Sequence, residues 1–565
     1  MDLFTLLSPL FSPHWLLAPI VLPLATAAVL LLLREEQRRL KVLIQLLSCS
    51  MGLGVAVLLL MQADAPSGPS GLGAYLPGNW PAPFGIVLAL DRLSALMLVL
   101  TATLGLVAAC YAAGGWYRAG VHFHPLLQFQ LMGLGGAFLT ADLFNLFVFF
   151  EITLAASYGL LLHGSGPARI GAGLHYVAVN LVASALFLVG VSMLYGITGT
   201  LNMADLARSV AEVAPADRGL LHAAAAILGV AFLIKAAVWP LNFWLVPAYS
   251  AATAPVAALF ALLTKLGLYA VLRLWTLLFG GDAGVSAGFA AAWLSGAGLV
   301  TLAWGALGLL ASQRLPAVAG YAAVVSSGLL LAAVGLGQAS VTAGLLFYLV
   351  SSTLGVALLF LLADLLERWR EREARPAPDE ATDDAPFLTP DLGSTQSHNL
   401  DDDEVALIGR PIPAGAAVLG LAFLGAVLLV AGLPPLPGFV GKVLIGQALL
   451  ALPGFTGPGI PWALLLLALM MVSGLAALVS LTRLGMRHFW SAQGRGTPVV
   501  RVAEGVPVAA LLALAVALTL HGEALLRYTT AAATALHQPA AYLETVLGAQ
   551  PVPSPAATAG REGER

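Results

Sequence analysis

Lysine and arginine are used in different places along this chain. Only four of its 26 basic residues are lysines, and three of them, Lys235, Lys265 and Lys442, stand inside long apolar segments. The basic residues of the polar connections are arginines, with Lys41 as the exception. Arginine keeps its proton in proteins, whereas a lysine moved from water into an apolar site can release a proton and bind it again. The three apolar lysines therefore predict a path that handles protons.

A single carboxylate, Glu151, lies in the apolar string NLFVFFEITLAASYGLLL. A carboxylate buried alone would take up a proton, so an ionised Glu151 implies a cationic partner, and we expect that partner to be Lys235. Separation of this pair would let Lys235 pass its proton toward Lys265 and then Lys442. Alternatively, the lysines reach the membrane surface or hold helices together without transport. Charge in the middle of a membrane is costly and usually marks an ion pathway, so transport is the favoured interpretation.

Other ionisable residues lie near the ends of the apolar segments, and more than one interpretation stays open for them. Asp91 and Asp142 fit helix capping or an interfacial role as well as they fit transport. His163 and His175 are able to relay protons, but a structural role is favoured for both. Asp364 is interpreted as interfacial because it ends its apolar segment.

The composition is that of an integral membrane protein. Of 565 residues, 59% are hydrophobic and 10% are charged, and the mean hydropathy is +0.91. Alternating strand patterns of the barrel type are absent, so the membrane spans are predicted to be helices. The net charge of -3 offers no basic face for nucleic acid. Cys49 and Cys110 lack metal-site spacing, and nucleotide, haem and iron–sulfur motifs are absent, so no cofactor is expected.

Fourteen apolar segments are long enough to cross a membrane as helices. They lie at residues 15–33, 42–61, 84–112, 123–140, 142–163, 172–197, 219–249, 251–279, 284–310, 316–336, 341–366, 413–451, 460–482 and 503–521. Arginines follow mainly the odd-numbered segments. The positive-inside rule therefore places those connections in the cytoplasm and both chain termini outside. We expect an all-α polytopic membrane protein.

Two of these segments are too long for one crossing. Residues 219–249 and 413–451 would measure about 46 Å and about 58 Å as continuous helices, against an apolar membrane thickness of about 30 Å. Prolines lie near the middle of each, at Pro240 in the first and from Pro434 onward in the second. Proline removes a backbone donor and interrupts a helix, so both segments are predicted to be broken helices.

The broken helices are the seventh and twelfth segments. A spacing of five segments reverses the direction of the chain through the membrane. Segments four to eight and nine to thirteen are therefore predicted to form two inverted five-helix repeats. Paired broken helices in inverted repeats are typical of ion-coupled transporters.

The predicted organisation has four parts. They are an N-terminal three-helix segment at 1–122, the first repeat at 123–279, the second repeat at 284–490, and the last membrane helix with a disordered tail at 491–565. The second repeat contains an acidic, proline-rich stretch, residues 367–410, which is predicted to be a flexible cytoplasmic linker. The tail from Gln538 is rich in Ala, Pro and Gly and is expected to be disordered as well.

Three strings of this chain carry a family resemblance. FNLFVFFEITLAASYGLLL, FLIKAAVWPLNFWLVPAYSAATAPVAALFALLTKLGLY and AGLPPLPGFVGKVLI resemble the antiporter-like proton-translocating subunits shared by respiratory complex I and by Mrp-type multisubunit cation/proton antiporters. The resemblance covers about residues 80–490. The chain length and the stretch LFYLVSSTLGVALLFLLADLLER are most similar to the D subunits of the Mrp type.

The resemblance implies fourteen core helices, two inverted repeats and broken helices seven and twelve. It also implies proton-relay roles for four residues, Glu151, Lys235, Lys265 and Lys442. Many relatives carry histidine just before the Ala-Pro of the eighth segment and in the tenth segment, where this chain has YSAATAP and YAAVVSSG. A histidine relay is therefore not expected at these places. The candidates to replace it, together with water, are Ser250, Ser326 and Ser327.

We expect a proton-translocating membrane subunit of a multisubunit monovalent cation (Na+)/H+ antiporter, which is a secondary transporter and not an enzyme. Its partners would be other subunits of the complex, membrane lipid, protons and Na+, in a bacterial cytoplasmic membrane. The alternative is a membrane subunit of complex I or of a related hydrogenase, in which redox partners drive the same proton path. A scaffold without transport is disfavoured, because inert packing has no use for four buried charges.

Overall fold

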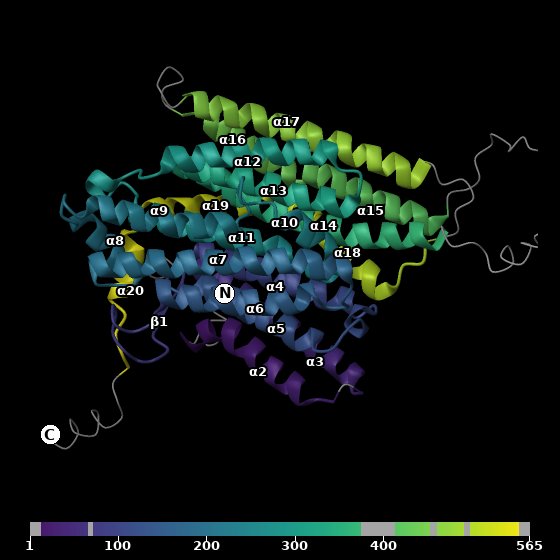
Figure 1. Ribbon diagram of the computed structural model, residues 1–565, viewed down its shortest axis with the longest axis horizontal. Helices are drawn as coiled ribbons and strands as arrows, with labels where there is room; N and C mark the ends of the chain where they lie inside the picture. Colours follow the sequence, from purple (N-terminus) through teal and green to yellow (C-terminus); the bar gives the residue numbers. More distant parts are fainter. Residues whose placement is uncertain are drawn as a thin grey trace, which may run out of the picture.

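The computed structural model describes residues 13–34, 36–65, 72–373, 413–452, 460–490 and 498–552. Over these ranges the protein consists of helices and one antiparallel sheet, in which β1 (Gly73–Tyr75) pairs with β2 (Leu88–Leu90). The long helices lie side by side, and their ends gather at two opposite faces of the molecule (Figure 1). This is the arrangement expected of a helical bundle that crosses a membrane.

The apolar segments fold as helices because a chain in an apolar surrounding must pair its own backbone groups. The helices of the first half are α2 (Ala18–Leu32), α3 (Arg38–Ala63), α4 (Arg92–Ala112), α5 (Phe123–Leu139), α6 (Leu143–Leu161), α7 (Pro167–Thr198), α8 (Met203–Glu212), α9 (Arg218–Lys235), α10 (Leu245–Ala251) and α11 (Ala254–Leu278). Those of the second half are α12 (Ala291–Ala311), α13 (Leu315–Gly335), α14 (Ala339–Glu373), α15 (Ala414–Ala431), α16 (Pro437–Leu450), α17 (Ile460–Gly485), α18 (Val502–Leu520), α19 (Gly522–His537) and α20 (Ala540–Leu547).

Thirteen of the helices in the described part of the chain are long and apolar enough to cross a membrane. The remaining predicted segment is α5, which is apolar but contains 17 residues. Each predicted segment thus corresponds to one helix or to a pair of half-helices. The prediction of an all-α polytopic membrane protein is confirmed.

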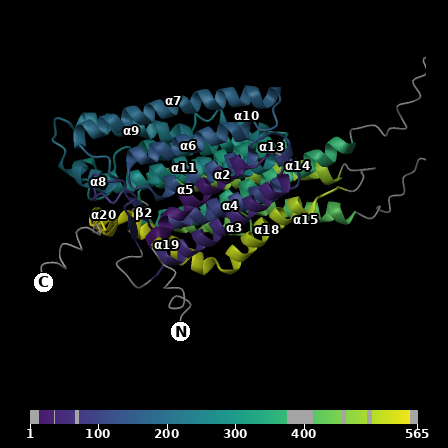
Figure 2. The ribbon, with the colours of Figure 1, turned by 90° about the horizontal axis from the view of Figure 1, so that it is seen from below.

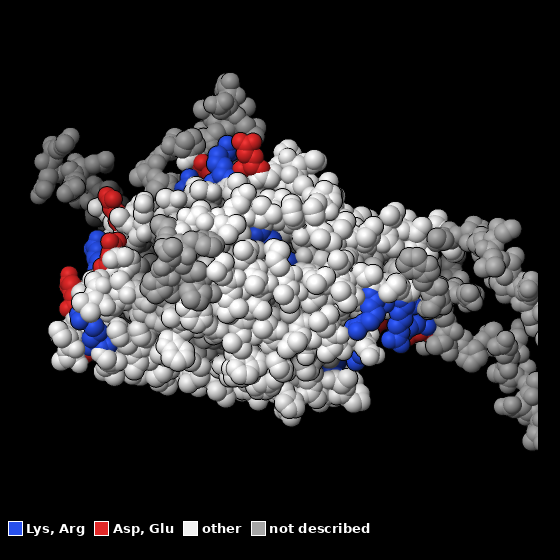
Figure 3. Space-filling view, turned by 90° about the horizontal axis from the view of Figure 1, so that it is seen from above, with Lys and Arg blue, Asp and Glu red and all other residues white. Residues whose placement is uncertain are grey.

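Two helices, α11 and α14, form the centre of the bundle. The apolar stretch of each is wholly buried, whereas 28% of the corresponding stretch is buried in α2 and in α18. Figure 2 shows α7 at one edge of the bundle, and its outer side chains, such as Leu174, are exposed. The middle of the face drawn in Figure 3 carries few charges, while charged residues gather mainly at its two ends and at one rim. An uncharged belt of this kind fits the apolar layer of a membrane.

Both predicted broken helices are present, the first as α9 and α10 and the second as α15 and α16. The first half of each broken helix, α9 or α15, is followed by the same type of backbone hydrogen bond, from an amide to the carbonyl five residues earlier. The Val238 amide donates to the Leu233 carbonyl at 3.0 Å, and the Leu433 amide donates to the Leu428 carbonyl at 2.9 Å. The two breaks therefore share one local geometry.

The residue before each of these donors has a left-handed backbone, with φ of 55° at Ala237 and 74° at Gly432. Glycine adopts this conformation freely, whereas it costs an L-residue such as alanine about 1–2 kcal/mol. The shared geometry agrees with the predicted pair of repeats. The boundaries of the two units, 123–279 and 284–490, stay a prediction.

The predicted disordered tail from Gln538 is wrong for residues 540–547, which form α20. The Tyr542 ring lies over the Arg273 guanidinium, with 5.2 Å between the guanidinium carbon and the ring centre, and Val546 is buried. Tyr542 and Val546 are one helical turn apart and form an apolar face of α20. The amino-acid composition of the tail does not reveal this face. The sequence analysis also misses α8, an amphipathic helix at the same end of the bundle as α20 (Figure 1).

The start of the predicted linker is also wrong, because residues 367–373 continue α14. Arg368 binds Asp364 at 3.0 Å and Glu504 of α18 at 2.9 Å. These ion pairs hold the last turns of α14 against α18, which explains why the helix extends beyond its apolar part. The rest of the predicted linker, 374–410, lies outside the described residues.

Candidate proton-transfer site

Lys235 is the last residue of α9, at the first helix break, and it is buried. Its ammonium group lies 5.2 Å from the centre of the Phe150 ring of α6. Among the described residues, none accepts a hydrogen bond from Lys235 Nζ. The carboxyl-terminal end of a helix carries partial negative charge, and an aromatic face attracts a cation. The surroundings of Lys235 therefore accommodate a positive charge without a fixed counter-ion.

The expected partnership of Glu151 with Lys235 is not a direct hydrogen bond, because Lys235 Nζ has no hydrogen-bond partner among the described residues. Glu151 is half-buried and accepts a hydrogen bond from the Ser184 hydroxyl of α7. Successive residues of a helix point about 100° apart, so the Phe150 ring lies against the Lys235 ammonium while the Glu151 carboxylate points toward Ser184. The two groups are neighbours that do not touch.

Lys265 lies in the wholly buried helix α11 and is joined to two serines. Its Nζ donates to Ser326 Oγ of α13 at 2.7 Å, and Ser326 Oγ donates to Ser352 Oγ of α14 at 2.9 Å. Ser326 is one of the three serines expected to replace a histidine. Ser352 is missed by the sequence analysis, although its position in the polar triplet SST within an apolar segment is a signal.

Lys442 reaches the second helix break from α16. Its Nζ donates at 2.7 Å to the carbonyl oxygen of Ala431, the last residue of α15. This carbonyl lies at the carboxyl-terminal end of α15, where the helix carries partial negative charge. Lys235 stands at the corresponding end of α9. A Cβ atom added at Gly474 of α17 would lie 3.1 Å from Lys442 Nζ, so the ammonium is closely enclosed.

Close helix packing brings the first break to α11. A Cβ atom added at Gly267, two residues after Lys265, would lie 2.8 Å from the Ala236 nitrogen and 2.9 Å from the Phe232 carbonyl oxygen. Glycine at this position lets α11 approach the end of α9 where Lys235 stands. The structure therefore brings the neighbourhoods of these two lysines together.

The other two serine candidates do not contact a lysine. Ser250 and Ser327 have buried hydroxyls without a partner among the described residues, as do Tyr249 and Thr253. Ser250 also lines a cavity of about 910 Å³ together with Arg169, His175 and Arg314. Buried hydroxyl groups of this kind usually bind ordered water. The cavity therefore lies beside α10, the short helix that immediately precedes α11.

The aspartates near the helix ends act as caps. Asp91 accepts from the Ser94 amide at 2.8 Å at the start of α4, and Asp142 accepts from the Asn145 amide at 2.7 Å at the start of α6. Of the interpretations left open, capping is therefore the one that the structure shows for both.

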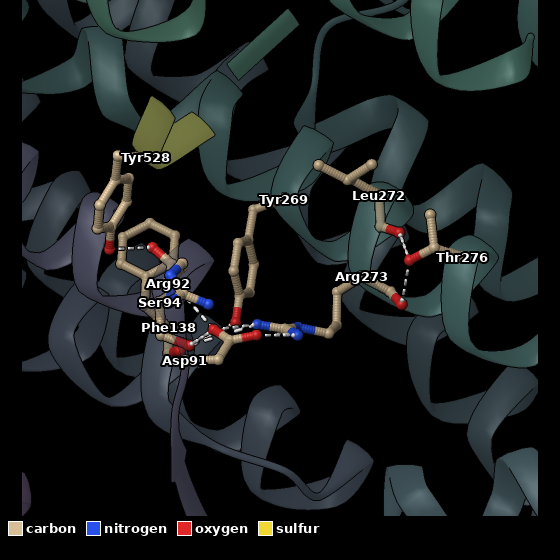
Figure 4. A network of polar contacts seen from close by, with 9 residues as sticks. All are labelled: Asp91, Arg92, Ser94, Phe138, Tyr269, Leu272, Arg273, Thr276 and Tyr528. Atoms are coloured by element: carbon tan, nitrogen blue, oxygen red, sulfur yellow. Dashed lines mark hydrogen bonds and ion pairs between the residues drawn. The ribbon is translucent and has the colours of Figure 1, made fainter. Parts of the chain in front are cut away.

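A second charged network, drawn in Figure 4, is missed by the sequence analysis. Arg273 of α11 binds both carboxylate oxygens of Asp91, at 2.5 and 2.7 Å, and its guanidinium lies over the Tyr269 ring. The available signal is an arginine inside the apolar string AVLRLWTLL. Because a guanidinium does not release its proton, we interpret the Arg273–Asp91 pair as a cross-link between α11 and the start of α4.

The two histidines have backbone partners. His163 lies in the turn that follows α6, and its Nε2 is 3.0 Å from the Trp116 carbonyl oxygen. Burial lowers the pKa of the His163 imidazole. His175 Nδ1 lies 2.9 Å from the Gly171 carbonyl oxygen, one turn earlier in α7. These contacts agree with the structural interpretation.

Comparison with known proteins identifies similarity along most of the chain. The sequence profile described as NADH:quinone oxidoreductase/Mrp antiporter, TM, matches residues 140–376. The D subunit of a probable K(+)/H(+) antiporter of Rhizobium meliloti (strain 1021) is 50% identical over 541 residues, which are 95% of this chain and 98% of the relative. The D subunit of a Na(+)/H(+) antiporter of Bacillus subtilis (strain 168) is 32% identical over 540 residues, which are 94% of this chain and 99% of the relative.

The fold is shared with a solved structure as well. A chain in the structure of the Mrp complex from Dietzia sp. DQ12-45-1b matches with a TM-score of 0.78 at 25% identity. The match covers 95% of this chain and 99% of that chain. The similarity thus includes the segments that carry Glu151 and the three buried lysines.

Proposed function

Because the chain belongs to the NADH:quinone oxidoreductase/Mrp antiporter family, with D subunits of antiporters among its relatives, we propose that it moves protons in a multisubunit monovalent cation/proton antiporter. The proposed relay consists of Glu151, Lys235, Lys265 and Lys442. The observation that supports it best is the burial of three lysines that, within the described residues, contact no carboxylate. An ammonium held by neutral oxygen atoms or an aromatic ring is able to release its proton and to regain it.

Each relay residue has a distinct task in this proposal. Glu151 is proposed to favour the protonated form of Lys235 through its negative charge, without a direct bond. When a change in neighbouring charge weakens that field, Lys235 gives up its proton toward Lys265, whose helix packs against the end of α9 at Gly267. Lys442 then takes up a proton next to the Ala431 carbonyl. Water would complete the gaps between these groups.

The half-buried position of Glu151 supports the presence of partner subunits. On the same side of α6, Phe144 and Val148 are exposed, so lipid would meet the carboxylate if this face were uncovered. An ionised carboxylate in contact with lipid is costly. We therefore infer that another subunit covers this face of α6. We also propose a bacterial cytoplasmic membrane, with both termini outside, as the arginine distribution predicts.

The exchanged cation is proposed from the relatives and not from a site in this chain. The sequence analysis predicts Na+, while the relatives described above are named for K+ and for Na+. Either ion would be exchanged for protons by the complete complex. The alternative, a membrane subunit of a redox-driven complex, would show itself by co-purification of flavin- or iron–sulfur-containing subunits.

The proposed function is tested in everted membrane vesicles that contain the complete set of subunits. Addition of NaCl or KCl to energised vesicles should dissipate the pH gradient, and the ion that acts at the lower concentration identifies the preferred cation. Lys265→Ala should abolish this response while the complex still assembles. If neither salt dissipates the gradient in vesicles with the assembled wild-type complex, the proposed function is wrong.

A further inference from the structure

Two serine hydroxyls connect Lys265 to α14. Lys265 Nζ donates to Ser326 Oγ at 2.7 Å, and Ser326 Oγ donates to Ser352 Oγ at 2.9 Å. Ser352 Oγ in turn donates to the Leu349 carbonyl of its own helix at 3.2 Å. We call Ser326 and Ser352 the hydroxyl bridge. Its hydrogen bonds run in one direction, away from the lysine.

The helix that bears Ser352 packs directly on the helix that bears Lys442. A Cβ atom added at Gly441 of α16 would lie 2.9 Å from the Tyr348 Cα, and Gly441 immediately precedes Lys442. α14 therefore extends from the hydroxyl bridge to the neighbourhood of Lys442 within about one helical turn.

Hydroxyl groups suit proton passage between two lysines. Each hydroxyl has one donor and two acceptor positions, so it accepts a hydrogen bond on one side while it donates on the other. Both bridge serines are buried, which keeps bulk water from competing for these bonds. A serine also stays neutral at physiological pH, unlike a histidine, which holds a proton near neutrality.

We propose that the hydroxyl bridge is the proton connection between Lys265 and Lys442, and that it conducts protons without storing them. This inference rests on the proposed function. A proton leaves the Lys265 ammonium for Ser326 Oγ as the original hydroxyl proton of Ser326 passes to Ser352 Oγ. Ser352 passes its own proton through water to the neutral amine of Lys442. Each serine oxygen again carries one proton, Lys265 is neutral and Lys442 is charged, and rotation of the hydroxyls restores the starting arrangement.

The experiment uses the assembled complex in everted vesicles with matched amounts of protein. The double variant Ser326→Ala with Ser352→Ala should lower cation-dependent proton movement about 100-fold, a loss typical of removing a proton-transfer group. Ser326→Thr keeps a hydroxyl and should retain a large part of the activity. The matched control is Ser351→Ala, which removes a buried hydroxyl that donates only to the Tyr348 carbonyl of its own helix, at 3.0 Å.

The rate ratio in H2O and D2O separates proton conduction from packing. Wild type and Ser326→Thr should both be slowed in D2O if hydroxyl protons move in the limiting step. A double alanine variant that works at the wild-type rate, or a Ser326→Thr variant that assembles but is as inactive as the alanine variant, overturns the proposal. Failure of the wild-type complex to couple cations to protons would instead refute the proposed function, so the two failures are distinct.

Discussion

At the scale of single residues, the buried lysines and the buried arginine have different proposed roles, proton transfer for the lysines and stabilisation for the arginine. Lys442 and Lys235 each lie at the negative end of a half-helix and have no carboxylate in contact among the described residues. Arg273 and Asp91, by contrast, form a buried pair whose two hydrogen bonds satisfy the carboxylate. A guanidinium paired in this way keeps its charge, so the pair contributes to stability and not to proton release.

We expect Asp91→Asn to destabilise the protein by about 3–5 kcal/mol, because the buried Arg273 charge loses its partner. Asparagine can still cap α4, so the effect reports on the lost charge. The control is Asp64→Asn, since Asp64 pairs with Arg92 at 3.4 Å in a partly exposed position and about 0–1 kcal/mol is expected there. The fraction of purified complex that survives a heating step measures both. Equal heat sensitivity of the two variants would rule out a structural role for the buried pair.

At the scale of structural elements, the two helix breaks create the lysine sites. Prolines interrupt both long apolar segments, and the same hydrogen bond closes the leading half of each. In the second break, Gly432 turns the chain so that the Ala431 carbonyl meets Lys442. The geometry of the break thus determines where the ammonium is held.

We expect Gly432→Ala to abolish transport. A Cβ atom there would lie 2.6 Å from Lys442 Cδ and 2.9 Å from Lys442 Nζ, and the left-handed φ of 74° would add about 1–2 kcal/mol of strain. Gly199→Ala is the matched control, because Gly199 has φ of 71° but no atom within 4 Å of an added Cβ. Cation-dependent proton movement, normalised to assembled complex, distinguishes them. If both variants lose the same share of activity, displacement of Lys442 is not the cause.

At the scale of the whole molecule, the sequence predicts those features that depend on long apolar runs. The helical class, the broken helices and the candidate lysines follow from hydropathy, prolines and rare charges. A direct contact between Glu151 and Lys235 does not follow, because the Phe150 ring, and not the Glu151 carboxylate, lies against the Lys235 ammonium. Ser352 and α20 are missed for a related reason, since their roles depend on what packs beside them.

We expect deletion of residues 538–565 to reduce assembly of the complex, because it removes α20 and the Tyr542 ring over Arg273. A desolvated cation–π contact contributes about 2 kcal/mol, and the buried side chain of Val546 is lost as well. Deletion of residues 553–565 is the control, since it removes none of the described residues. Native gels of both truncations report the amount of complex. Equal amounts would mean that α20 contributes nothing to the fold.

The most direct measurement of a lysine relay is the cation-dependent proton movement of Lys235→Arg in everted vesicles, with expression matched to wild type. Arginine preserves the positive charge at the end of α9 but does not release a proton. We predict that Lys235→Arg is almost as inactive as Lys235→Ala while the complex still assembles. Activity of Lys235→Arg near that of wild type would show that Lys235 only anchors charge, and it would contradict the relay.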